Sequence, residues 1–353
     1  MADSAKEKPL NFISSSPHVA STVNSVTLMR RVLIALAPVS IFGVILYGLP
    51  ALLTIVVAIV SAELAEALFR KIIRREMRNK DLSAAVTGLL LALVLPPSTP
   101  LWITAMGAFF AIIVAKEFFG GLGANVFNPA LIGRGFILLS FPVAATRWSL
   151  PMSFFPADSG IAASATGYVA DAISGATPLG ILKMQGTIAD VGAGLAATGL
   201  AAGSDYCSTI TSLFIGIRGG CIGESSILLI LMGFIYLLAT RTIDWRTPVM
   251  MILSVFVFSF LFGRDPLFAV LAGGVLFGAV FMATDYVTGP LTSTGKIIFG
   301  LCAGLITVLI RQWGNYPEGV TYGILICNAV TPYLNRLLQK KYGFIKPAKG
   351  GAK

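Results

Sequence analysis

Apolar stretches long enough to cross a lipid bilayer recur along the whole sequence, and they constrain the fold more than any other feature. Of the 353 residues, 56% are hydrophobic and only 12% are charged, and the mean hydropathy is +0.84. A soluble domain carries about a quarter charged residues. Backbone polar groups inside a bilayer must be satisfied within the chain, so we expect an all-α polytopic membrane protein.

The apolar pattern predicts ten transmembrane helices and one long loop. The helices are expected at 32–48, 51–69, 82–95, 101–119, 126–141, 225–240, 247–263, 267–283, 295–311 and 319–337. The chain is thereby divided into an N-terminal segment 1–30, five helices within 31–141, a loop at 142–224, five helices within 225–338 and a basic tail 339–353. The third helix is short and ends in LPPSTP, so we expect it to be broken or re-entrant. The fifth contains NPALIGRGF, and we expect its Pro and Gly to interrupt it.

The distribution of positive charge predicts the orientation. The net charge is +10, concentrated in RKIIRREMRNK (70–80), RTIDWR (241–246) and the C-terminal tail. With ten spans these segments and both termini fall on one side, which the positive-inside rule makes cytoplasmic. The loop at 142–224 then lies outside the cytoplasm. In a soluble protein this charge would suggest nucleic acid, but here topology accounts for it, and we expect no nucleic-acid partner. The polar N-terminal stretch lacks the apolar core that a signal peptide has, so we expect no cleavable signal peptide in it.

A short polar motif lies in the middle of the long loop, within YVADAISGATPLGI (168–181). By composition alone it is typical of a surface turn. The order of its residues, however, matches D-x-x-S-G-A-T, the signature at which a flavin transferase joins FMN to threonine through a phosphoester. The matching residues are Asp171, Ser174, Gly175, Ala176 and Thr177. Small side chains before the threonine would let the backbone approach a phosphate, and Pro178 stiffens the chain after it.

Five segments together resemble a known family over essentially the whole chain. They are SPHVASTVNSVTLMRRVLIALAP, LSAAVTGLLLALVLPP, GGLGANVFNPALIGR, DAISGATPL and FMATDYVTGPLTSTGK. The family contains the D subunits of Rnf (also Rsx) ion-translocating oxidoreductases and the B subunits of Na+-translocating NADH:quinone reductases. Only about 30 residues precede the first predicted helix, which favours the Rnf branch because the quinone-reductase relatives usually have a longer N-terminal region.

The resemblance implies an electron-relay subunit in a bacterial inner-membrane complex that passes electrons between ferredoxin and NAD and moves Na+ or H+. It implies covalent FMN on Thr177 and a second, non-covalent flavin, riboflavin. Implied partners are the other membrane and iron–sulfur subunits, through which ferredoxin and NAD act, and a flavin transferase. The cysteines form no CxxC motif, which agrees with iron–sulfur centres in partner subunits. The B subunit of a quinone reductase and a solute channel or secondary transporter remain the alternatives.

Two asparagines and an aspartate are candidates for the second flavin. Asn125 and Asn128 lie in GANVFNPA, and their amides suit the donor–acceptor edge of a flavin ring. Helix capping before a proline explains them equally well. Asp285 holds the corresponding place in MATDYVTGP if the chain is internally duplicated, as the similar layouts of the third and seventh helices and of the fifth and ninth suggest.

Charged residues within the apolar helices are candidates for an ion path. Glu63 and Glu66 lie three residues apart and would share one face of the second helix. Carboxylates in membranes are costly and often mark ion pathways, but Glu66 also has Arg70 four residues on as a pairing partner. Lys116 and Glu117 near the end of the fourth helix are expected to be interfacial, or a gate.

The remaining candidates are two cysteines and the single histidine. Cys207 and Cys221 flank a short segment near the outer face and either pair or stay free. His18, the only histidine, cannot build a metal site alone, and we expect it to contact a partner subunit.

Overall fold

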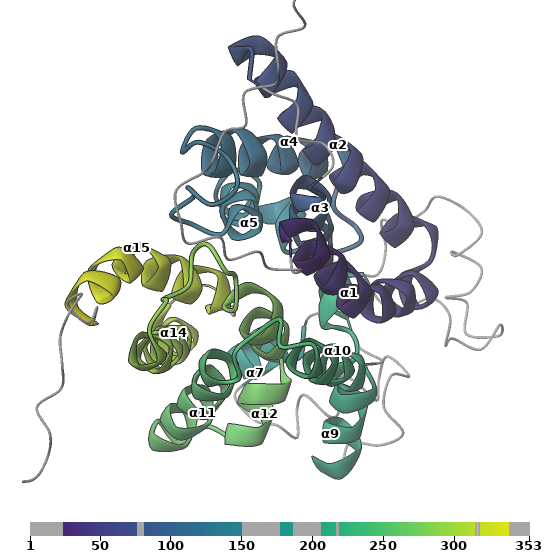
Figure 1. Cartoon of the computed structure of the whole chain (residues 1–353). Helices are drawn as coiled ribbons and strands as arrows, with labels where there is room; N and C mark the ends of the chain where they lie inside the picture. The colour runs from purple at the N-terminus through teal and green to yellow at the C-terminus, as the bar shows by residue number, and fades with distance from the viewer. Residues whose placement is uncertain are drawn as a thin grey trace, which may run out of the picture.

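A computed structural model describes residues 24–75, 81–149, 177–185, 206–216, 219–314, 316 and 318–338. This part of the chain is built of helices and contains no β-strand, so the predicted all-α class is confirmed (Figure 1). The N-terminal half holds α1 Ser25–Tyr47, α2 Leu49–Ile73, α3 Ser83–Leu93, α4 Leu101–Ile112, the π-helical turn η1 Ile113–Glu117, α5 Pro129–Ser140 and α6 Pro142–Ala145. The short helices α7 Pro178–Gln185, α9 Tyr206–Ile215 and η4 Ile222–Glu224 follow. The C-terminal half holds α10 Ile227–Ala239, α11 Arg246–Leu261, α12 Pro266–Leu271, α13 Val275–Phe277, the π-helical turn η5 Gly278–Met282, α14 Ser293–Trp313 and α15 Val320–Leu338.

Each of the ten predicted ranges contains a helix, but the helices differ in length. Three of them, α1, α2 and α14, are long and apolar enough to cross a membrane by length and composition. Their outward faces carry exposed Leu, Ile and Val side chains, as lipid-facing helices do. The other helices in the predicted ranges are shorter or less apolar, so the number of ten crossings stays a prediction.

The two halves of the chain form two groups of helices that meet along the centre of the molecule (Figure 1). The halves touch where α1 packs against α10 and where α5 packs against α15. One continuous core of buried apolar side chains runs through both. The helix α7, which comes from the long loop, lies with the C-terminal group. Its Leu179 packs with Leu213 and Phe268 in a separate small apolar cluster.

The third predicted helix is short, as expected, and it is enclosed by protein. All 11 residues of α3 are buried. Its N-terminus is held by Asp81, whose Oδ1 accepts the backbone N–H of Ser83 at 3.3 Å. Gly88 permits the close approach of α2, because a Cβ there would lie 2.7 Å from the carbonyl oxygen of Ala58.

The expectation of an interrupted fifth helix is wrong, and the interruption lies in the eighth. Helix α5 is continuous because Pro129 occupies its first turn, where no intrahelical N–H is required. The eighth segment, at 267–283, instead contains α12, α13 and η5. Its first helix, α12, ends at Leu271 because the chain turns at Gly273, whose φ is +70°. The segment resumes as α13 and ends in the π-helical turn η5.

Paired segments of the two halves share local features, in agreement with the suggested duplication. Asp81 before α3 and Asp244 before α11 each accept the backbone N–H of the residue two positions on, at 3.3 and 3.2 Å. The fourth and eighth segments both end in a π-helical turn. The helices that follow, α5 and α14, are capped by the side chains of Asn128 and Thr292.

The packing of α3 on α2 generates the first prediction. Gly88→Ala should destabilise the folded chain by about 1–3 kcal/mol, because the added methyl group meets rigid backbone. Gly135→Ala is the matched control, since a Cβ at that position in α5 finds its nearest neighbour, Leu325, at 3.9 Å. Thermal unfolding in detergent measures both variants. Equal unfolding temperatures would contradict the tight α2–α3 contact.

Candidate functional site

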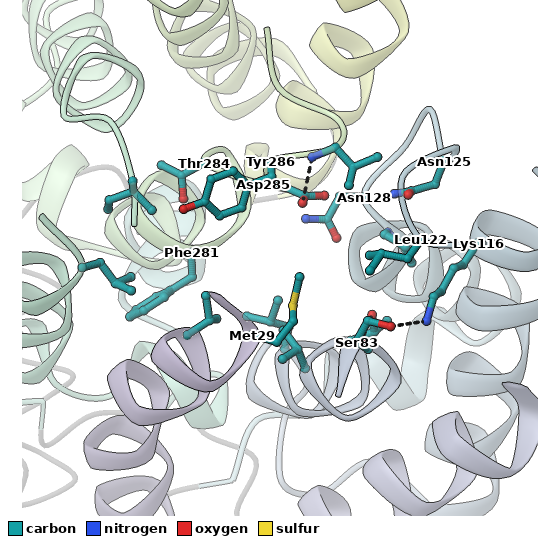
Figure 2. A pocket seen from close by; sticks show the side chains of 18 of the residues that line it. Met29, Ser83, Lys116, Leu122, Asn125, Asn128, Phe281, Thr284, Asp285 and Tyr286 are labelled. Atoms are coloured by element: carbon teal, nitrogen blue, oxygen red, sulfur yellow. Dashed lines mark hydrogen bonds between the residues drawn. The ribbon is translucent and has the colours of Figure 1, made fainter. Parts of the chain in front are cut away.

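A pocket opens at the end of the bundle where α1, α3 and α5 begin and the eighth segment ends (Figure 2). It encloses roughly 730 Å³ of space free of protein atoms, its open mouth included. Met29 and Phe281 provide apolar lining, and polar side chains converge from other sides. The pocket has the apolar lining with a few converging polar groups that is typical of sites for small organic molecules.

Three residues singled out in the sequence, Asn125, Asn128 and Asp285, meet in this pocket. The Oδ1 atom of Asn128 accepts the backbone N–H of Ala130 at 3.0 Å, so the capping interpretation is correct for this residue. Its Nδ2 donates to the carbonyl oxygen of Met282 at 3.3 Å and ties α5 to η5. Asn128 therefore holds the pocket together as well as lining it.

Asp285 follows the eighth segment and presents a partly buried carboxylate to the pocket. Its oxygens accept the hydroxyl of Thr288 at 3.1 Å and the backbone N–H of Val287 at 3.4 Å. Burial raises the pKa of this carboxyl above its usual value, and the hydrogen bonds oppose that rise. The group is thus suited to hydrogen bonding with a ligand.

Lys116 lines the same pocket, although the sequence indicated only an interfacial or gating residue. Its side chain is 2% exposed. The Nζ atom donates to Ser83 Oγ at 2.7 Å and to Glu66 Oε2 at 2.8 Å. The sequence signal was a Lys-Glu pair inside an apolar run, but the partners that hold the lysine come from other helices and were not evident.

The Glu66 cluster consists of Glu66, Arg70, Lys116 and Glu117, all buried. Arg70 Nη2 lies 2.7 Å from Glu66 and 2.8 Å from Glu117, which confirms the predicted pairing of Glu66 with Arg70. The two cations balance the two anions. Glu63 is exposed and lies outside the cluster, so the two glutamates differ in burial although they are three residues apart on one helix. Packing against α3 and α4 covers Glu66, and the edge of this packed surface leaves Glu63 exposed.

Thr177 lies at the N-terminus of α7, and its side chain is buried. Its Oγ1 accepts the backbone N–H of Gly180 at 3.1 Å, and its carbonyl accepts that of Ile181 at 2.9 Å. This is the bonding of an N-cap residue, with Pro178 in the first helical position. The other motif residues, Asp171, Ser174, Gly175 and Ala176, lie outside the described residues.

A second pocket of roughly 530 Å³ borders α7. Its lining includes three cationic side chains, Lys183, Arg264 and Arg311, and one carboxylate, Asp265. Partial burial lowers the pKa of Lys183. An excess of cations in such a lining favours an anionic group such as a phosphate.

The eighth segment connects the surroundings of Thr177 with the first pocket. Near its start, Phe268 and Ala272 pack with Leu179 of α7, while near its end Phe281 lines the first pocket. From Ala272 to Phe281 the rise would be about 14 Å if the chain were helical throughout. The two candidate sites thus lie at opposite ends of one interrupted helix.

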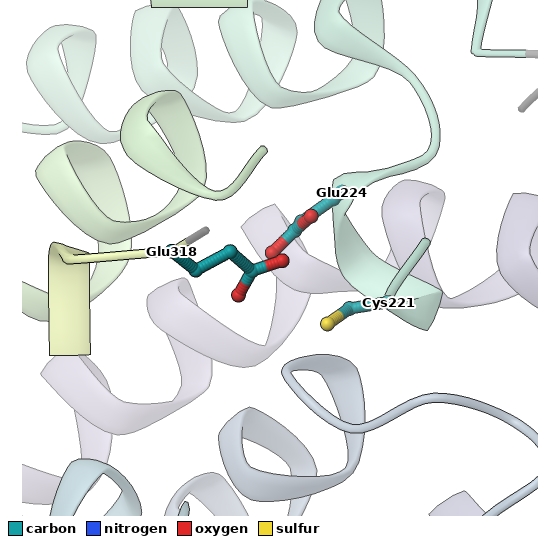
Figure 3. A group of neighbouring side chains, drawn as sticks. All are labelled: Cys221, Glu224 and Glu318. Atoms are coloured by element: carbon teal, nitrogen blue, oxygen red, sulfur yellow. The ribbon is translucent and has the colours of Figure 1, made fainter. Parts of the chain in front are cut away.

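A group formed by the buried Cys221 and Glu224 and the partly buried Glu318 lies between the two halves, with ligand atoms within 4.8 Å of one another (Figure 3). Arg134 forms an ion pair with Glu318 and donates to Cys221 Sγ at 3.6 Å. The thiol donates to the carbonyl oxygen of Val94 at 3.0 Å. The guanidinium compensates one carboxylate, and the group joins α5 to the segments that precede α10 and α15.

Cys207 and Cys221 do not form a disulfide in the structure. Cys207 is an exposed free thiol and Cys221 is a buried one. His18 lies outside the described residues, so its expected contact with a partner subunit stays a prediction.

The chain matches a family model over residues 12–343, described as the NQR2, RnfD, RnfE family. It is 42% identical over 97% of its length to the D subunit of the proton-translocating ferredoxin:NAD(+) oxidoreductase complex of Clostridium ljungdahlii, 99% of which is covered. It is 38% identical over 95% of its length to the D subunit of the Na(+)-translocating ferredoxin:NAD(+) oxidoreductase complex of Acetobacterium woodii, 96% of which is covered. It is also 38% identical to the D subunit of the ion-translocating oxidoreductase complex of Stutzerimonas stutzeri, over 90% of this chain and 91% of the relative.

Proposed function

The chain belongs to the NQR2, RnfD, RnfE family, and we propose from this premise that it is the D subunit of an Rnf-type complex. In that role it relays electrons within an ion-translocating ferredoxin:NAD oxidoreductase that moves Na+ or H+ across a bacterial inner membrane. The observation that carries the proposal is the similarity, at 42% and 38% identity over nearly the whole chain, to D subunits of ion-translocating ferredoxin:NAD(+) oxidoreductase complexes. The membrane-spanning helices agree with it.

Covalent FMN on Thr177 is the first part of the proposal. The hydroxyl stands at a helix N-terminus, where the macrodipole favours a phosphate, and the N–H of Gly180 holds its oxygen in place. Lys183 and Arg311 border the neighbouring pocket and suit a negatively charged group. A bound flavin would supply the redox chemistry, while the chain positions the ring and excludes water. A flavin transferase would make the phosphoester.

A non-covalent flavin in the first pocket is the second part. The pocket offers the side-chain donors and acceptors of Asn125, Asn128 and Asp285, which suit the polar edge of a flavin ring, together with apolar lining. By the positive-inside orientation this pocket lies at the cytoplasmic end and Thr177 at the opposite end. Two flavins so placed would carry electrons along the eighth segment.

The family model covers both the Rnf subunits and the B subunits of quinone reductases, so the match alone does not separate the two. The partner subunits of the complex would separate them. The relatives named above are D subunits of ferredoxin:NAD(+) oxidoreductase or ion-translocating oxidoreductase complexes, and none of the three is named as a quinone-reductase subunit, which favours the Rnf assignment. Co-purification of subunits with ferredoxin-like cysteine motifs would support it. A solute channel or secondary transporter is the remaining alternative, and an unmodified chain without bound flavin would favour that class.

Thr177→Ala should abolish covalent flavin, because the substitution removes the only oxygen that can form the phosphoester at that residue. Thr177→Ser should retain part of it, since the hydroxyl survives. Flavin fluorescence of the denatured band in an SDS gel measures both variants in cells that contain the transferase. Fluorescence in the alanine variant equal to that of the parent chain would refute the site.

Asn128→Asp and Asn128→Ala separate ligand binding from helix capping. Both remove the Nδ2 donor and should weaken binding of the non-covalent flavin by on the order of tenfold. The aspartate keeps an oxygen that caps α5, whereas alanine should cost about 1 kcal/mol of stability. Flavin released by denaturation of Thr177→Ala chains and thermal unfolding provide the two readouts. Full flavin occupancy in the aspartate variant would contradict the assignment of the pocket.

A further inference from the structure

A buried lysine side chain in the wall of a pocket is unusual in a membrane protein and needs a reason. Lys116 is 2% exposed, yet it lines the first pocket together with Ser83. Figure 2 shows its ammonium group bonded to Ser83 on the side of the pocket that also holds Asn125. Burying a cation is tolerated where an anion and further hydrogen bonds compensate it.

The π-helical turn η1 brings Lys116 into this position. It ends the fourth segment and buries two consecutive charged residues, Lys116 and Glu117. Their partners differ: Glu117 bonds Arg70, while Lys116 bonds Glu66. Single π-helical turns within α-helices frequently occur at functional sites. The distorted turn therefore provides an ion-paired lysine that faces a cavity.

The partners of Lys116 fix the ammonium but leave it bonding capacity. An ammonium group carries three hydrogens, and Glu66 and Ser83 account for two hydrogen bonds. Ser83 is itself anchored, because its hydroxyl donates to Asp81 at 2.9 Å. Glu66 is held by Arg70 at 2.7 Å. The lysine is thus oriented by two anchored groups and can donate to a ligand in the pocket.

We propose that Lys116 binds the N1–C2 carbonyl edge of the flavin ring in this pocket and raises its reduction potential, with Glu66 as a positioning residue. This inference rests on the proposed function, which places a non-covalent flavin there. A flavin ring that gains two electrons and one proton carries one negative charge, shared by N1 and the C2 carbonyl oxygen. A cation beside that edge stabilises the reduced ring more than the oxidised ring. In the test, an electrode supplies the electrons through mediators and water supplies the proton.

The test uses full-length Thr177→Ala chain in detergent, in which the pocket holds the only flavin under the proposed function. Spectroelectrochemical titration measures the midpoint potential of the bound flavin. Glu66→Gln should raise the potential, because it removes an anion and leaves Lys116 charged. The double variant Glu66→Gln with Lys116→Met leaves the Arg70–Glu117 pair balanced and should lower the potential below the parent value. At a fixed potential, the ratio of reduced to oxidised flavin should rise by on the order of tenfold in Glu66→Gln and fall by a similar factor in the double variant.

Two further variants separate charge from structure. Lys116→Arg keeps the cation and should stay near the parent potential. Arg147→Gln removes an exposed cation beyond the far end of α5, outside the linings of both pockets, and should not change the potential. Thermal unfolding confirms that each variant folds. Loss of flavin from the double variant that Lys116→Arg does not share would also support a binding role.

The outcomes distinguish this inference from the proposed function. Unchanged potentials, or shifts of the same sign in Glu66→Gln and the double variant, would overturn the role of Lys116 while leaving a flavin in the pocket. Absence of flavin from the Thr177→Ala parent would overturn the occupancy of the pocket, and the inference with it.

Discussion

The ion pair between Lys116 and Glu66 is the interaction on which the first pocket depends. A buried charge without a partner is strongly unfavourable in the apolar interior. The ion pair therefore holds the two elements that carry these residues next to each other. Glu66 belongs to α2 and Lys116 to η1, and Ser83 brings in α3. The wall of the pocket is therefore built by charge compensation, and the apolar residues around it only fill space.

The eighth segment places the two candidate sites at its opposite ends. The segment is broken at Gly273. The part before the break packs against Leu179 of α7, and the part after it lines the first pocket. Interrupted helices are tolerated in membranes only where protein or a cavity satisfies the freed groups. Here Arg311 does so, because it donates to the carbonyl oxygens of Ala269 and Ala272 at 2.5 and 3.1 Å.

Much of this arrangement could be predicted from the sequence, and the failures have physical causes. Apolar runs gave the helix positions, and the duplicated layout correctly grouped Asn128 with Asp285. Glu63 and Glu66 looked equivalent because helical spacing does not say which neighbour covers which side. The break after Leu271 was missed because two glycines in an apolar run also suit a tightly packed helix. The partners of Lys116 come from two other helices, which spacing along one helix cannot reveal.

The central claim is that a flavin phosphate is bonded to the hydroxyl at the start of α7. Mass spectrometry of the proteolytic peptide containing Thr177, from protein purified from its native host, tests it most directly. The account predicts a peptide heavier by the mass of FMN less one water, with fragments that place the added mass on Thr177. A peptide with the mass of the bare polypeptide would contradict the account.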